Sequence, residues 1–589
     1  MSVPTLKSRL NICFVLTLLP ALPLAGRLVY LQTVQHEALS DFASREFNRK
    51  IPEAGPRGRI LDRSGEVLAE SLPSWYCSVL KSEAKTPEKI MKALAPVLGM
   101  PVKELTGKWQ RGKNFICLRK DLDPETAQKV SNLKLPSVSL SMTQTRSYPG
   151  KDIARDLLGV VGTDGHGLSG LEQLYERLLS RNMRYREVIK DGAGRIIYRQ
   201  GERKEKYPPD IRLTLDKNIQ FFCQQAIREA VESNRADMGM VLVQEPASGN
   251  LLALAAWPQN LHKTPPIQWV YEPGSTFKLI TLAAALDKKT IDLSDKIDCE
   301  KGAWALLPKV IIHDHTPEGV LSISGVMERS SNIGAAKIAL KTGLENFYFY
   351  ARAFGFGTKT GLNFPGESAG LMRSIKYWKQ VDLAVAGYGH GIGATSLQIL
   401  NAYSAVANRG IMMETRLVDR ITDRSGKVLS YRKPMKIRRV ISENTADAVR
   451  NMLEKTVESG TGTQARIRSY RVAGKTGTSR KLTADGKYTD TQHIASFCGF
   501  APAGNPQFTV LVVLDNPRVK HYGGETAAPA FAEIAKRILV LKGTPADRPE
   551  ESLTVLAVTP TKNLASESAT FKNPLEKNNE NFSTGKAGL

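Results

Sequence analysis

The chain has 589 residues, which is too long for one ordinary domain, so two or three folded units with a tether or tail are expected. Hydrophobic residues make up 42% and charged residues 24%, values that exclude a polytopic membrane protein and a largely disordered chain. The formal net charge is +24. Because the sequence contains no zinc-finger spacing, RNP-type aromatic motif or basic zipper, we expect no nucleic-acid partner, and attraction to anionic lipid headgroups fits the charge better.

An apolar stretch near the N-terminus predicts a transmembrane anchor over residues 10–31. Lys7 and Arg9 precede it, and basic residues of this kind stay on the cytoplasmic side of a membrane. Residues 1–9 are therefore predicted to be a cytoplasmic N-terminus, and the rest of the chain is predicted to be exported.

Three residues argue against an uncleaved anchor. Pro20 and Pro23 interrupt the hydrogen-bond ladder of a helix, and Arg27 must extend its charge to the membrane interface. The alternative is a signal peptide that is cleaved near Gly26. The anchor is favoured because apolar residues continue beyond that point, and both interpretations predict export.

Residues 32–209 are predicted to form a mixed pedestal domain for interaction or dimerisation. The pattern is helical to about Asn48 and then broken, and residues 60–69 are typical of a strand, a turn and a second strand. Up to about Pro209 the predicted elements are short and mixed.

Residues 210–542 are predicted to form an α+β domain, an antiparallel sheet flanked by helices with a helical subdomain. A strand at 210–215 is followed by a helix with an apolar face, a hairpin at 240–255 and a late strand at 508–513. The six cysteines are too scattered to indicate a zinc site or a disulfide-dense framework, so no metal is expected. No cofactor is expected either. Residues 543–589 are polar and are predicted to be a disordered tail.

A serine and a lysine one helical turn apart form the first candidate catalytic group. Pro273 and Gly274 end the preceding structure, and the Ala-rich run after Ser275 is typical of a buried helix. Ser275 is therefore predicted in the first turn, with Lys278 on the same face. The pattern Ser-x-x-Lys recurs elsewhere in the chain, so by itself it indicates nothing, and its context decides.

Two further motifs supply that context. Ser330 and Asn332 form a Ser-x-Asn that follows the nucleophile and opens a predicted helix. Lys-Thr-Gly occurs twice: Lys359 lies in a loop broken by glycine and proline, and we reject it. Lys475 lies in a strand followed by a polar turn and a return strand, and such an edge hairpin can form one wall of a cleft.

The three motifs, in this order and context, resemble those of the penicillin-binding protein and serine β-lactamase superfamily. Additional segments resemble the class B penicillin-binding proteins, so that the resemblance covers roughly residues 5 to 542. These segments are residues 57–65, 146–150, 167–172, 387–391 and 522–524. Residues 57–65 are expected to be a structural turn, and 387–391 a site of tight packing near the cleft.

The resemblance implies a role for each matched residue. Ser275 is the nucleophile and Lys278 its general base; Ser330 relays the proton to the leaving amine. Asn332 holds the substrate amide and Lys278, and Lys475 tunes the electrostatics. The implied substrate-binding residues, which receive the terminal carboxylate of D-Ala-D-Ala, are Thr476, Gly477 and Thr478. The backbone N–H groups of Ser275 and Thr478 are the implied oxyanion hole.

A lysine base has to be neutral near pH 7. Because the pKa of lysine is ordinarily about 10.4, lowering this pKa to about 7 costs about 4.6 kcal/mol. Burial and the charge of Lys475 are expected to lower the pKa of Lys278. The alternative is a buried Lys278 that stays charged and plays no part as a base.

The resemblance implies a peptidoglycan D,D-transpeptidase that cross-links stem peptides through an acyl-enzyme, releases D-Ala and is acylated by β-lactams. It places the protein in the bacterial cytoplasmic (inner) membrane with its catalytic domain in the periplasm. Residues 271–274 and 354–357 favour the division (septal) branch, with a polytopic glycan polymerase and other division proteins as partners. The alternatives are a rod-elongation transpeptidase, a D,D-carboxypeptidase or β-lactamase, and a β-lactam-sensing receptor or inactive scaffold.

Overall fold

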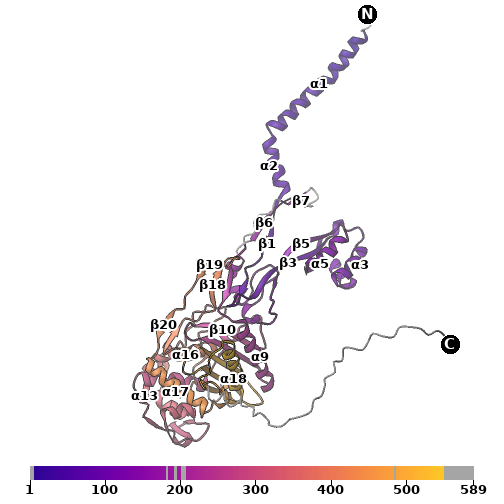
Figure 1. Cartoon of the computed structure of the whole chain (residues 1–589). Helices are drawn as coiled ribbons and strands as arrows, with labels where there is room; N and C mark the ends of the chain where they lie inside the picture. Colours follow the sequence, from indigo (N-terminus) through magenta and orange to yellow (C-terminus); the bar gives the residue numbers. More distant parts are fainter. Residues whose placement is uncertain (1–4, 181–182, 191–195, 200–206, 483–485, 549–589) are drawn as a thin grey trace, which may run out of the picture.

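The computed structural model describes residues 5–180, 183–190, 196–199, 207–482 and 486–548. The molecule is elongated (Figure 1): the N-terminal helix α1 projects at one end, and the large C-terminal unit lies at the other. The tail predicted from residue 543 lies outside the described residues from 549 onward.

Helix α1 (Leu6–Thr33) is long and apolar enough to cross a bilayer. Its most apolar 18-residue window has a mean hydropathy of 2.0, and none of that window is buried against the rest of the protein. The helix continues through Pro20 and Pro23, the two residues that argued against an anchor. A second helix, α2 (His36–Phe47), leads from it into the pedestal.

The pedestal is built on two sheets. A three-stranded sheet has the order β1-β6-β7, and a seven-stranded sheet has the order β19-β18-β8-β2-β3-β4, with β5 paired to β3. The strands are β1 (Asn48–Ala54), β2 (Ile60–Leu61), β3 (Val67–Leu80), β4 (Phe115–Leu122), β5 (Val138–Ser147), β6 (Met183–Lys190), β7 (Ile196–Arg199), β8 (Asp210–Leu213), β18 (Val418–Thr422) and β19 (Val428–Tyr431).

Strand β3 corrects the expectation that pedestal elements stay short, because it runs for 14 residues and pairs with β2, β4 and β5. Its far end carries a small apolar core covered by helices α3 (Pro87–Leu98), α4 (Val102–Arg111) and α5 (Pro124–Asn132). Polar residues and Pro73 in its middle interrupt the simple alternation that would have marked one long strand.

The predicted turn after β2 is structural, as expected. One oxygen of the Asp62 carboxylate accepts hydrogen bonds from the backbone N–H groups of Ser64, Gly65 and Glu66, at 2.8–2.9 Å. Nearby, Arg57 is buried and pairs with Glu172 at 2.9 Å. The ion pair of Arg57 and Glu172 thus connects the segment before the turn to the rest of the pedestal.

Strand β8 lies in the pedestal sheet, parallel to β2, although it opens the second unit in the sequence. On its other side it pairs with β18, which comes from the C-terminal unit. Asp210 at its start accepts two hydrogen bonds from the guanidinium of Arg59, at 2.9 and 2.5 Å. One continuous sheet therefore joins the two units.

The C-terminal unit is built on a five-stranded antiparallel sheet with the order β10-β9-β23-β22-β21. The strands are β9 (Met238–Glu245), β10 (Asn250–Trp257), β21 (Ala473–Leu482), β22 (Tyr488–Ala501) and β23 (Phe508–Asp515). Successive side chains of β9 enter different cores, Met240 and Leu242 one and Val241 and Val243 the other. The predicted α+β sheet with covered faces is confirmed.

Helices cover both faces of this sheet. One face packs against α9 (Lys217–Asn234) and α18 (Gly523–Leu541), and the other against α16 (Ser396–Ala407) and the buried helix α11 (Lys278–Asp287). The helical subdomain beside α11 comprises α12 (Ile323–Glu328), α13 (Asn332–Thr342), α14 (Leu344–Ala353), α15 (Gln380–Ala386) and α17 (Glu443–Glu458). The short strand pairs β12 (Lys296–Asp298) with β15 (Val320–Ser322) and β13 (Ala303–Leu307) with β14 (Val310–His313) lie before it in the chain.

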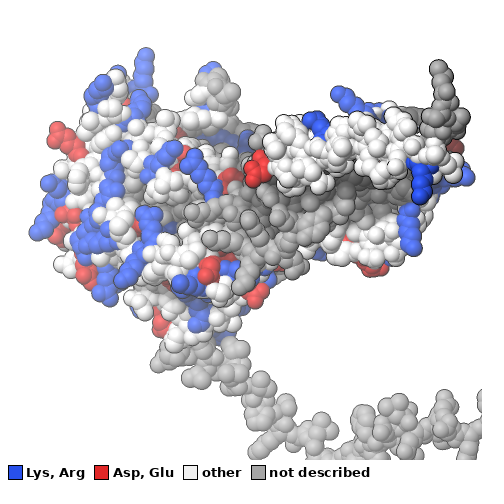
Figure 2. Space-filling view, turned by 90° about the horizontal axis from the view of Figure 1, so that it is seen from above, with Lys and Arg blue, Asp and Glu red and all other residues white. Residues whose placement is uncertain are grey.

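Basic residues are dispersed over the surface. Figure 2 shows Lys and Arg spread over the described part of the face seen from above, with Asp and Glu among them. This distribution has no single basic stripe of the kind that follows a nucleic-acid backbone on that face.

Candidate active site

Ser275 lies at the entry to a buried helix. It belongs to a 3-10 turn, η2 (Gly274–Phe277), that runs directly into α11, so the helix proper begins at Lys278. Gly274 has a φ of +56°, and a Cβ on it would lie 3.1 Å from the carbonyl oxygen of Thr478. Glycine at this position therefore lets the nucleophile turn approach strand β21.

Lys278 reaches back to the serine as the spacing predicted. Its side chain is fully buried, and Nζ donates to Ser275 Oγ at 3.0 Å. The same Nζ donates to Asn332 Oδ1 at 2.8 Å and to the carbonyl oxygen of Ser330 at 2.5 Å. The amine is thus fixed by three groups and points at the hydroxyl.

Ser330 brings its backbone and its hydroxyl into the site at once. Its φ is +62°, a left-handed conformation that is uncommon for a residue with a side chain and often marks a functional position. In this conformation the carbonyl oxygen faces Lys278, and Oγ lies 3.2 Å from Lys278 Nζ and 2.8 Å from Lys475 Nζ. The hydroxyl therefore bridges the two amines.

Lys475 faces the pair from β21, which is the edge strand of the sheet. Its side chain is fully buried, and Nζ also contacts Thr476 Oγ1 at 3.2 Å and Thr461 Oγ1 at 3.5 Å. Thr478 lies two residues farther along the same strand, and its Oγ1 accepts from Gly523 N at 3.1 Å. The lysine and the two threonines thus line one wall.

Gly477 is the point where the wall meets the nucleophile turn. A Cβ there would lie 2.4 Å from Ser496 Oγ and 2.9 Å from Thr276 Cγ2, closer than real contacts allow. Any side chain at this position would push the edge strand away from Ser275.

Burial governs the protonation of both lysines. It lowers the pKa of Lys278 to about 7, although the carboxylate of Asp314 acts in the opposite direction. Burial also lowers the pKa of Lys475 well below its ordinary value, and the charge of Lys278 adds to that effect. Burial was expected to lower the pKa of Lys278 and is the main cause of the shift.

Asp314 is a site residue that the sequence pattern did not indicate. It accepts from the backbone N–H groups of Asn332 at 2.5 Å and Ile333 at 3.0 Å, and from Ser331 Oγ at 2.6 Å. These bonds cap the N-terminus of α13 with a carboxylate. The neighbouring carbonyl of His313 accepts from Asn332 Nδ2 at 2.9 Å, which turns Oδ1 toward Lys278.

The glycine-rich segment 387–391 packs against the nucleophile turn, as expected. Gly389 has a φ of +84°, and a Cβ on it would lie 2.1 Å from the carbonyl oxygen of Gly274. At the same place the carboxylate of Glu272 accepts from Gly391 N at 2.8 Å and from Tyr488 Oη at 3.0 Å. Tyr488 had not been predicted near the site, because its partner Glu272 is 216 residues away in sequence.

The structure brings together all eight candidate residues, from three separate segments of the chain: Ser275, Lys278, Ser330, Asn332, Lys475, Thr476, Gly477 and Thr478. The rejected triplet remains outside. Lys359 is exposed and lies in a loop without strand structure, where Thr360 bonds to Glu367.

Comparisons with known proteins agree with this geometry. Residues 239–536 match the penicillin binding protein transpeptidase domain, and residues 52–213 match the penicillin-binding protein dimerisation domain. The chain belongs to the class B penicillin-binding proteins. The transpeptidase match contains all three motifs, and the dimerisation match ends with strand β8, in agreement with the sheet to which β8 belongs.

Relatives of this class B penicillin-binding protein extend over nearly its whole length. It is 31% identical to the probable peptidoglycan D,D-transpeptidase PenA of Neisseria meningitidis, over 91% of this chain and 92% of the relative. It is 29% identical to the peptidoglycan D,D-transpeptidase FtsI of Escherichia coli, over 88% and 89%. Like these relatives, it is a peptidoglycan D,D-transpeptidase.

A solved structure supports the same fold. Penicillin binding protein 3 from Mycobacterium tuberculosis, crystallised in complex with aztreonam, superimposes with a TM-score of 0.66 and 26% identity. The match covers 85% of this chain and 99% of that structure. The arrangement of pedestal and catalytic unit is therefore shared.

Proposed function

We propose that this transpeptidase works through an acyl-enzyme on Ser275, with Lys278 as general base. Neutral Lys278 takes the proton of Ser275 Oγ while Oγ bonds to the carbonyl carbon of the penultimate D-Ala. The bond from that carbon to the terminal D-Ala nitrogen then breaks, and the proton passes through Ser330 to the leaving amine. An acceptor amine attacks the resulting ester, forms the cross-link and returns a proton to Ser275.

The observation that carries the proposal is the continuous chain of contacts from Ser275 through Lys278 and Ser330 to Lys475. Each link is between 2.8 and 3.2 Å long. The pKa of Lys278 of about 7 supports a base that is partly neutral at physiological pH. No histidine is needed in this arrangement.

The backbone N–H groups of Ser275 and Thr478 are proposed as the oxyanion hole. The carbonyl oxygen of Thr478 lies close to Gly274, so this edge of strand β21 faces the turn that carries Ser275. Because N–H and C=O of one strand residue point to the same side, the N–H of Thr478 faces the turn as well. Thr476 and Thr478 then receive the substrate carboxylate on the same wall, and Gly477 keeps the wall close.

Covalent labelling with a fluorescent penicillin tests the mechanism. The unsubstituted protein is expected to form one stable adduct, and Ser275→Ala is expected to form none while its circular dichroism spectrum stays unchanged. Asn332→Ala, which removes a contact to Lys278 but keeps the nucleophile, serves as the matched control and should label slowly. Persistent labelling of folded Ser275→Ala would refute the assignment.

We further propose a septal role, with α1 as a single-pass anchor in the inner membrane and the catalytic domain in the periplasm. The sequence likeness at residues 271–274 and 354–357 supports the division branch, and relatives named FtsI agree with it. A polytopic glycan polymerase and other division proteins are the expected partners. Imaging a tagged copy in dividing cells tests this role, and a uniform side-wall signal would count against it.

A further inference from the structure

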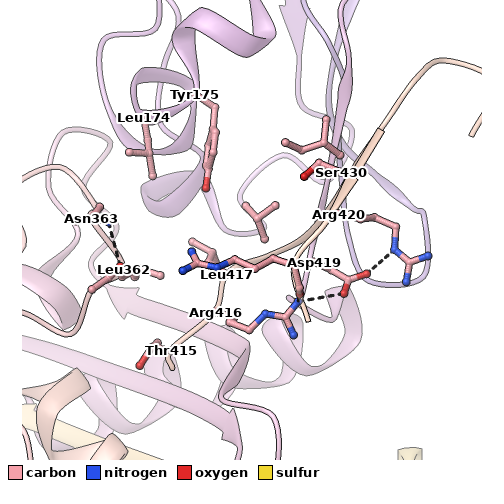
Figure 3. A pocket seen from close by; sticks show the side chains of 14 residues that line it. Leu174, Tyr175, Leu362, Asn363, Thr415, Arg416, Leu417, Asp419, Arg420 and Ser430 are labelled. Atoms are coloured by element: carbon pink, nitrogen blue, oxygen red, sulfur yellow. Dashed lines mark hydrogen bonds and ion pairs between the residues drawn. The ribbon is translucent and has the colours of Figure 1, made fainter. Parts of the chain in front are cut away.

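A cavity of about 250 Å³ lies where the pedestal meets the catalytic unit, outside the catalytic residues (Figure 3). Three segments form its wall: Leu174 and Tyr175 from the pedestal, the loop 361–363, and residues 415–421 with the neighbouring Ser430 and Arg432. These segments are far apart in sequence and come together around the cavity. A ligand in the cavity would contact both units at once.

One wall contains a buried donor with no partner. The side chain of Arg416 is 3% exposed, and its Nη1 donates to Asn250 Oδ1 at 3.0 Å, while Nη2 donates to the carbonyl oxygen of Arg432. Its Nε is buried and has no hydrogen-bond partner among the described residues. Leaving a buried donor unpaired costs about 1–3 kcal/mol, so this N–H calls for an acceptor in the cavity.

The charges of the lining favour an anion. Three guanidinium groups line the cavity, those of Arg416, Arg420 and Arg432, against one carboxylate, that of Asp419. Arg420 takes up much of that carboxylate, because its Nε donates to Asp419 Oδ2 at 2.6 Å, whereas Arg416 lies 3.5 Å from Oδ1. Glu414, next to the lining residue Thr415, pairs with Arg432 at 2.6 Å, so three guanidinium groups face two carboxylates and one positive charge is in surplus.

The remaining wall is apolar and sets the size and shape of the ligand. Leu174, Leu362 and Leu417 face the cavity, and the hydroxyl of Tyr175 points into it from the pedestal side (Figure 3). Burial raises the pKa of Tyr175, so this hydroxyl stays a donor at neutral pH. A volume of about eight waters, at about 30 Å³ each, admits a molecule no larger than a dipeptide.

We propose that this cavity is a second binding site, for a small aliphatic carboxylate of at most dipeptide size. The carboxylate would accept from Arg416 Nε and Tyr175 Oη, and the aliphatic part would lie against the three leucines. Free D-alanine and the end of a D-Ala-terminated peptide share this chemistry. The choice of these two compounds as probes rests on the proposed function, whereas the anion site itself does not.

Binding is measured on the full-length protein in detergent after acylation of Ser275 by penicillin, so that the catalytic cleft is occupied. D-alanine and N-acetyl-D-alanyl-D-alanine are titrated separately by calorimetry, and the unfolding temperature is recorded at each concentration. At least one of them is expected to bind saturably and to raise the unfolding temperature, because a ligand of the native state stabilises it. The compound that binds more tightly identifies the source of the carboxylate.

Three variants locate the binding. Leu362→Phe fills the cavity and should abolish binding, and Arg432→Gln should weaken it about 5- to 10-fold by removing one charged wall. Lys427→Gln, which makes the same charge change on the exposed turn of the same hairpin, should bind like the unsubstituted protein. Penicillin labelling of each variant shows that it is folded, and Arg432→Gln decides if Leu362→Phe does not fold.

The proposal is overturned if neither carboxylate binds the acylated protein, or if binding is unchanged in folded Leu362→Phe and Arg432→Gln. Binding of inorganic phosphate without binding of either carboxylate would also overturn it. A failure of penicillin labelling in the unsubstituted protein would instead contradict the proposed function, so the two failures are distinguishable.

Discussion

The triplet Lys-Thr-Gly occurs twice in this chain, in two different structural environments. At Lys475 it lies on an edge strand, with the lysine fully buried and bonded to the hydroxyl of Ser330. At Lys359 it lies in a surface loop with the lysine exposed, and Gly361 lines the cavity where the pedestal meets the catalytic unit, the junction cavity. The residues around a motif, and not the motif, give its lysine a chemical role.

The difference follows from what surrounds each threonine. Thr476 contacts the amine of its own lysine and the hydroxyl of Thr461 at 2.8 Å, inside a wall of the cleft. Thr360 donates through N and Oγ1 to Glu367 Oε1, at 2.6 Å each, and so holds a loop together. The loop triplet at Lys359 is thus expected to serve stability, and the strand triplet at Lys475 catalysis.

Replacing the two lysines in turn should give the largest contrast. Lys475→Met is expected to lower the rate constant of acylation by penicillin about 10²- to 10⁴-fold, because the amine that supports Ser330 is lost. Lys359→Met should leave that rate constant within about twofold. Stopped-flow acylation of both folded variants measures the difference, and equal effects would show that the comparison is mistaken.

The next largest effect is expected on the pH dependence of acylation, which should depend on Lys278 and not on Lys359. With the pKa of Lys278 at about 7, the neutral base is lost as the pH falls, so the rate constant should drop about tenfold per pH unit below that value and level off above it. Lys359→Met should keep this profile. A rate constant that is flat between about pH 5.5 and 8 would contradict the assignment of Lys278 as the base.

The smallest expected effect is on stability, at the loop triplet. The Glu367 side chain is nearly buried and accepts from Thr360 and from Asn363 N at 3.1 Å. Glu367→Gln should lower the free energy of unfolding by about 1–3 kcal/mol, because charge-assisted bonds are lost. The acylation rate constant of the folded protein should be unchanged. Urea unfolding measures the loss of stability, and penicillin labelling measures acylation. A matching loss of acylation would contradict a purely structural role for the loop triplet.

Local sequence patterns predicted what depends on neighbouring residues. The hairpin of β9 and β10, the edge position of β21 and the helix that follows Ser331 were all predicted from alternation, turns and caps. Asp314 and Thr461 were not, because each meets its partners only through the folded chain. The left-handed backbone of Ser330 was equally hidden, since no glycine marks it.

The sheet partners of β8 escaped prediction for a related reason. The strand is contiguous in sequence with α9 of the catalytic unit, yet it pairs with β2, about 150 residues earlier, and with β18, about 200 residues later. Periodicity indicates that a strand exists and which of its faces is buried, but it carries no information on its neighbour. The junction cavity, whose lining comes from the same long-range contacts, could not have been predicted either.

The distance between α1 and the catalytic unit has a consequence for the cell wall. Because they lie at opposite ends of the molecule (Figure 1), a chain held in a bilayer by α1 carries its cleft at a set height above the lipid surface. Stem peptides would then meet the cleft at a distance from the lipid that the pedestal sets.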